Sequence, residues 1–150
     1  MFRSVKEFEE AGDLTPAETQ LIAAVRAGRV CWLCDPKSPV RPEAPTPENR
    51  LRASLLHVLI TGGTDKCGLH ESGVAALGGW IDGGLDLAYC HARGETQLDF
   101  CHFVEPPSFY NAHFNSSAFR AAISPAFSRK EPLSRRAYSL GIQIQPERSI

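Results

Sequence analysis

The sequence lacks the long apolar runs that membrane and exported proteins carry. No stretch reaches the roughly 18 consecutive apolar residues of a membrane-spanning helix. The first ten residues contain no apolar core of signal-peptide length. An excess of charge is also missing, because the formal net charge is -1, and this excludes a DNA-mimicking polyanion and a polycation alike. These absences predict a soluble, unexported protein in the cytoplasm.

Cysteine is scarce and odd in number. The chain has 5 cysteines, so pairing them all would leave one thiol over. Thiols stay reduced in the cytoplasm, and a disulfide framework is therefore not expected.

The chain nevertheless has enough apolar content for one folded domain. It has 150 residues, of which 43% are hydrophobic and 22% charged, as in ordinary globular proteins. Residues 120–150 carry an excess of positive charge, centred on Arg129, Lys130, Arg135 and Arg136. Glu131 and Pro132 interrupt this cluster and no aromatic stacking platform accompanies it. We interpret it as a solvated basic tail, and nucleic acid is not favoured as a partner.

Two segments begin with the same helix-start chemistry. Thr15-Pro16-Ala17-Glu18 predicts a capping box with proline at the first helical position, and Gly28 predicts the end of that helix. The same helix-start pattern recurs at Thr46-Pro47-Glu48-Asn49, and Gly62-Gly63 predicts the end of this second helix. Its expected apolar face consists of Leu51, Leu55, Val58 and Leu59. The connector between them, residues 36–47, holds five prolines, which forbid a helix and favour extended, partly polyproline structure.

The pattern changes at residue 73. Leu85-Asp86-Leu87 and Leu98-Asp99-Phe100 alternate apolar and acidic residues, which is typical of half-buried strands. A ladder then recurs at spacings of five or six, and its members are Leu98, Phe103, Phe109, Phe114 and Phe119. Because helix faces recur at three or four and strand faces at two, this spacing indicates a chain that turns a corner about every five residues.

The order of these motifs resembles that of bacterial pentapeptide-repeat-like proteins. The resemblance covers about residues 14–119 and rests on the Thr-Pro-Ala-Glu helix, the proline-rich connector, Arg-x-x-Leu-Leu at 52–56, His-x-x-Gly at 70–73 and the stretch from Gly73 to Leu87. It implies an α+β fold in which two N-terminal helices cap a short right-handed β-helix. Some proteins of this kind carry an oxidoreductase label, but no redox-cofactor motif in this chain supports it.

The expected organisation has three parts that form one cooperative unit. These are a helical cap at 1–72 that contains the connector, a short β-solenoid at 73–124, and an irregular basic tail at 125–150. So few coils leave an exposed solenoid end. We therefore expect a homodimer, or another protein partner, to dock at that open end.

One set of cysteines and a histidine has the spacing of a metal site. Cys31 and Cys34 are two residues apart, and Cys67 and His70 repeat that spacing, so the four predict a tetrahedral structural zinc site. Buried cysteine is the other interpretation, since cysteine often serves as a small apolar residue. Cys-Trp-Leu-Cys does not fit a redox dithiol, because Pro36 follows where that motif needs a helix.

Two further pairs, Cys90-His91 and Cys101-His102, recur eleven residues apart. Adjacent strand residues face opposite sides, so a joint site of all four is not expected. A catalytic Cys–His pair between neighbouring segments stays open, but nothing in the sequence selects one.

The sequence favours a non-enzymatic scaffold or protein-interaction module without a cofactor. The alternatives are a small zinc-stabilised binding module and, by the family label alone, an oxidoreductase-like protein.

Overall fold

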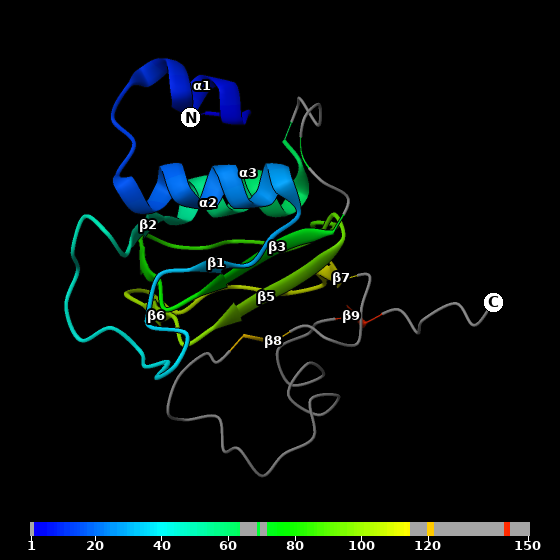
Figure 1. Ribbon diagram of the computed structural model, residues 1–150. Helices are drawn as coiled ribbons and strands as arrows, with labels where there is room; N and C mark the ends of the chain where they lie inside the picture. Colours follow the sequence, from blue (N-terminus) through cyan, green and yellow to red (C-terminus); the bar gives the residue numbers. More distant parts are fainter. Residues whose placement is uncertain (1, 64–68, 70–71, 115–119, 122–142, 145–150) are drawn as a thin grey trace, which may run out of the picture.

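The computed structural model describes residues 2–63, 69, 72–114, 120–121 and 143–144. The helices in this part of the chain are α1 (Val5–Ala11), α2 (Pro16–Ala27) and α3 (Ala53–Thr61). The strands are β1 (Cys31–Trp32), β2 (Arg50–Arg52), β3 (Gly73–Leu77), β4 (Trp80–Asp82), β5 (Glu95–Asp99), β6 (His102–Phe103), β7 (His113–Phe114), β8 (Arg120–Ala121) and β9 (Gln143–Ile144). Figure 1 shows the helices gathered on one side of the strands.

The first predicted helix is confirmed as α2. The Thr15 hydroxyl accepts a hydrogen bond from the Glu18 backbone N–H at 3.1 Å, and the Glu18 carboxylate accepts one from the Thr15 backbone N–H at 3.0 Å. This is the reciprocal capping box that the sequence predicted. Gly28 ends the helix in the left-handed conformation, with φ 70°.

The second predicted helix begins later than expected. The Asn49 side chain accepts a hydrogen bond from the Thr46 backbone N–H at 2.7 Å, and this closes a turn instead of opening a helix. Residues 50–52 then pair with β4, so α3 starts only at Ala53. The helix α1 was not predicted; Ser4 caps it, and Val5 and Phe8 are its buried residues.

The strands form parallel sheets, and two of the strand pairs share one pairing offset. One sheet has the order β1-β3-β5-β8, a second has β2-β4-β6, and β7 pairs with β9. β3 pairs with β5, and β4 with β6, at an offset of 22 residues, as Gly73 does with Glu95 and Trp80 with His102. β5 pairs with β8 at an offset of 23, and β7 pairs with β9 at an offset of 30. Two isolated bridges, Asp86 with Ser108 and His91 with His113, also have the offset of 22 residues.

The predicted short right-handed β-helix over 73–124 is wrong. In the described residues the fold is α+β, with three helices and separate parallel sheets, and β1 and β2 join these sheets from before residue 73. The spacing of five or six residues does mark the inward-facing positions between residues 76 and 109, but it does not determine how the strands pair. These positions are Ala76, Ile81, Leu87, Ala92, Leu98, Phe103 and Phe109. Phe119 and almost all of the predicted tail lie outside the described residues.

A single apolar core joins the helices to the sheets. It runs from Phe8 of α1 through Leu21 of α2 and Leu55 of α3 to Leu98 of β5, each at most 1% exposed. Burial of such side chains contributes roughly 1.5–3 kcal/mol each. In Figure 1, α2 and α3 lie side by side over the strands, and α1 lies on their far side.

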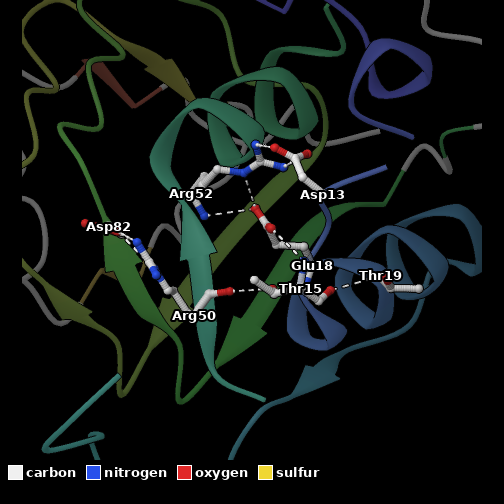
Figure 2. A network of polar contacts seen from close by, with 7 residues as sticks. All are labelled: Asp13, Thr15, Glu18, Thr19, Arg50, Arg52 and Asp82. Atoms are coloured by element: carbon white, nitrogen blue, oxygen red, sulfur yellow. Dashed lines mark hydrogen bonds and ion pairs between the residues drawn. The ribbon is translucent and has the colours of Figure 1, made fainter. Parts of the chain in front are cut away.

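A polar network fixes α2 to the start of α3. The Glu18 carboxylate, 1% exposed, accepts hydrogen bonds from the Arg52 backbone N–H at 3.2 Å and from Arg52 Nε at 2.9 Å. Arg52 also pairs with Asp13, and Arg50 pairs with Asp82 of β4 (Figure 2). The network therefore sets the position of the helix that carries His57.

Candidate functional site

The predicted zinc ligands fall partly outside the described residues. Cys67 and His70 are not described, so the four-residue set stays a prediction. Cys31 is on β1, 1% exposed within the apolar core, and burial raises the pKa of its thiol to about 12. A metal-bound cysteine is a thiolate, which this apolar surrounding disfavours. Within the described ranges, no group of three or more His, Cys, Asp or Glu side chains could hold a metal ion.

Cys34 lies against the turn at Gly78. A Cβ built on Gly78 would approach the Cys34 Sγ to 2.8 Å, so only glycine allows this contact. Gly78 also has φ 86°, in the left-handed region that favours glycine. The half-buried Cys34 thus packs on the backbone at Gly78.

In the second Cys-His pair, the cysteine is buried in the core and the histidine lies nearer the surface. Cys101 is 1% exposed, its thiol donates to the Ala76 carbonyl at 3.7 Å, and burial raises its pKa to about 12. His102 is only half-buried, and its ring stacks on Trp80 with centroids 4.2 Å apart. Cys101 therefore lies in the core, while the neighbouring His102 is half-buried against Trp80.

A Cys–His contact does occur, but with a histidine that the sequence did not indicate. The Cys90 Sγ lies 3.6 Å from Nε2 of His57, which comes from α3. Both side chains are half-buried. Burial, and after it the Asp86 carboxylate, raises the pKa of the Cys90 thiol. The contact joins residues that are 33 positions apart in the sequence, so no local sequence motif could predict it.

Two pairs of aromatic rings include the residues on either side of Cys90 in the sequence. Tyr89 and Tyr110 form an edge-to-face pair with centroids 5.6 Å apart, and they are 68% and 56% exposed. The Tyr89 backbone N–H donates to the Tyr110 carbonyl at 2.9 Å, which holds the two rings in register. The His91 and His113 rings stack at 4.5 Å. We call Tyr89 and Tyr110 the tyrosine pair.

The backbone at Tyr89 is unusual for an exposed tyrosine. Its φ is 60°, and Gly78, Phe100 and Asn111 also have positive φ, so the chain enters the left-handed region at every eleventh residue. A tyrosine there costs of order 1–3 kcal/mol relative to glycine. Because its ring is two-thirds exposed, burial does not offset that cost.

The sequence carried a weak signal for this surface. Gly78 and Asn111 are residue types that tolerate positive φ, but Tyr89 and Phe100 at the intervening positions conceal the eleven-residue recurrence. The tyrosine pair itself was not singled out, since isolated exposed aromatic residues are common on protein surfaces.

No described helix has the length and apolar content needed to cross a bilayer. Comparisons with protein-family models, with curated proteins and with solved structures found no match. The resemblance to pentapeptide-repeat-like proteins therefore stays a prediction.

Proposed function

We propose that this chain is a non-enzymatic protein-binding module whose binding surface is the tyrosine pair. The observation that carries the proposal is that these two large rings are held in fixed register and left exposed. Tyrosine is enriched among the residues that dominate binding energy at interfaces, because it buries a large area and loses little side-chain entropy. A strained backbone under an exposed ring is also more typical of a functional position than of a packing position.

The partner that we propose is a second copy of the chain, through its connector. The two most exposed large hydrophobic residues of the described structure are Tyr89 at 68% and Val40 of the connector at 61%. Both are exposed in the same chain, so the connector does not cover its own tyrosine pair. Extended proline-rich segments commonly bind aromatic surfaces.

The spacing of the prolines suits such an interaction. Pro36, Pro39, Pro42 and Pro45 recur at every third residue. A polyproline II segment has three residues per turn, so prolines at this spacing align along one edge when the connector is extended. Each copy offers one connector and one tyrosine pair, and reciprocal exchange between two copies would use all four surfaces.

The test is the concentration dependence of the mass of the full chain by analytical ultracentrifugation. We expect a reversible monomer–dimer equilibrium that Tyr89→Gly weakens at least about 30-fold, the effect of losing a side chain worth about 2 kcal/mol. Glycine accepts the left-handed backbone, so this variant should unfold no more easily than the parent chain. Val40→Asp should weaken association in the same way.

Val104→Ala is the matched control, because Val104 is also exposed, at 48%, but lies outside both surfaces. Its association constant should equal that of the parent chain. A monomeric mass up to about 1 mM would refute the choice of a second copy. An association constant unchanged in Tyr89→Gly would refute the tyrosine pair as the binding surface.

A further inference from the structure

The Cys90–His57 contact has the composition of a nucleophile with its base. The imidazole lies on α3, and the thiol lies in the segment between β4 and β5. Backbone hydrogen bonds hold the thiol side: the Cys90 N–H donates to the Leu87 carbonyl at 3.0 Å, and the Cys90 carbonyl accepts from the His113 N–H at 2.8 Å. The distance between Sγ and Nε2 is thus set by packed elements on both sides.

Cys90 differs from the other described cysteines. Cys31 and Cys101 are each 1% exposed, and their thiols have a pKa of about 12. Cys34 is half-buried like Cys90, but no imidazole contact is seen for it within the described residues. Cys90 therefore combines access to solvent with an adjacent proton acceptor.

The chemistry of the pair follows from its surroundings. Burial and the Asp86 carboxylate raise the pKa of the Cys90 thiol, so the resting group keeps its proton. A protonated thiol attacks slowly unless a neighbouring base removes the proton during the reaction. The Nε2 atom of His57, at 3.6 Å from the sulfur, is placed to accept it in the tautomer whose proton is on Nδ1.

We propose that Cys90 and His57 form a thiol–imidazole pair that exchanges with small cationic disulfides, which makes Cys90 a site of S-thiolation. The Cys90 proton passes to His57 Nε2 as the sulfur attacks one sulfur of the disulfide. A new S–S bond forms on Cys90, the S–S bond of the reagent breaks, and the departing thiolate takes the proton back from His57. Cys90 is oxidised and half of the reagent is reduced to a thiol, so atoms and electrons balance.

The preference for a cationic reagent comes from Asp86. Its exposed carboxylate accepts a hydrogen bond from the Ala88 backbone N–H at 3.0 Å, and the Cys90 thiol donates to the Ala88 carbonyl at 3.5 Å, so the two groups share one turn. The charge of this carboxylate attracts an ammonium group and repels a carboxylate on an approaching disulfide. Cystamine, which carries two ammonium groups, should therefore react faster than dithiodiglycolate, which carries two carboxylates.

The experiment follows disulfide exchange on the reduced full chain at neutral pH. Cystamine is added, and peptide mapping by mass spectrometry gives a rate for each cysteine. We expect Cys90 to react at least about tenfold faster than Cys34. His57→Gln should slow Cys90 at least about tenfold and leave the Cys34 rate unchanged, while circular dichroism checks that the variant is folded.

Asp86→Asn provides the second readout. It should reduce the ratio of the cystamine rate to the dithiodiglycolate rate at Cys90 and leave the ratio at Cys34 as it was. The proposal is overturned by a Cys90 rate no higher than that of Cys34, or by a Cys90 rate that His57→Gln does not lower. An unchanged reagent ratio in Asp86→Asn would overturn the cationic preference.

Discussion

Replacing Glu18 by alanine tests whether the network between α2 and α3 holds the fold together. The Glu18 side chain is 1% exposed and accepts three hydrogen bonds: from the Thr15 backbone N–H, the Arg52 backbone N–H and Arg52 Nε. Alanine leaves these donors without their acceptor, and the half-buried Arg52 guanidinium keeps Asp13 and its position over the Phe8 ring. The mutation also removes half of the capping box of α2.

The size of the effect follows from burial. Removing one partner of a buried ion pair costs about 3–5 kcal/mol. Arg52 is 28% exposed and keeps Asp13, so we expect the lower end of that range, about 3 kcal/mol. For a domain of this size each kcal/mol lowers Tm by roughly 2–4 °C, which gives a fall of about 6–12 °C.

Glu9→Ala is the matched control. Glu9 also pairs with an arginine, Arg26, but the two side chains are 40% and 43% exposed. An exposed pair contributes about 0–1 kcal/mol. The assay is urea unfolding followed by circular dichroism, with the denaturant slope compared between variants to check that both unfold in the same way. Equal losses of unfolding free energy in Glu18→Ala and Glu9→Ala would refute the structural role of the network.

Two more predictions concern the backbone and the predicted metal site. Gly73→Ala should destabilise the protein by more than about 3 kcal/mol, because φ is 93° and the added Cβ would lie 2.0 Å from the Glu95 carbonyl oxygen. The control Gly12→Ala, with φ 72° and open space around the added Cβ, should cost only about 1 kcal/mol. Thermal unfolding of the two variants measures the difference, and similar Tm values would contradict the close approach of β3 to β5. The zinc hypothesis for Cys31, Cys34, Cys67 and His70 predicts about one equivalent of zinc in protein purified without chelator, and elemental analysis showing less than about a tenth would exclude it.

Local chemistry made some elements predictable from the sequence. The capping box and the terminal glycine of α2 depend on neighbours within the helix, so Thr15, Glu18 and Gly28 were sufficient. The same opening at Thr46 failed because long-range pairing decided the outcome: Leu51 lies beside Ile81 in a parallel sheet, and residues paired in a sheet cannot also begin a helix.

The sheets and the candidate site could not be predicted in the same way. The ladder of phenylalanines was correctly identified as inward-facing at Phe103 and Phe109, but its spacing alone did not determine how the strands pair. The Cys90–His57 contact depends on where α3 packs, and that position is set by the core and by Glu18. Sequence periodicity shows which side of an element is buried, but it does not show which other element covers it.

The pairing of β3 with β5 and of β4 with β6, both at an offset of 22 residues, makes different parts of the chain unequal in their tolerance of length changes. Deleting one residue between β4 and β5 would move β5 out of step with β3, and β6 out of step with β4. In a strand, a shift of one residue turns its core face toward solvent. The length of the connector, residues 36–47, does not affect this strand register. Doubling the length of a flexible loop raises the entropic cost of closing it by only about 0.6 kcal/mol. An insertion in the connector would therefore leave the strand pairing intact and interrupt only the proposed binding segment, whereas the segment from 73 to 114 should be left at its natural length.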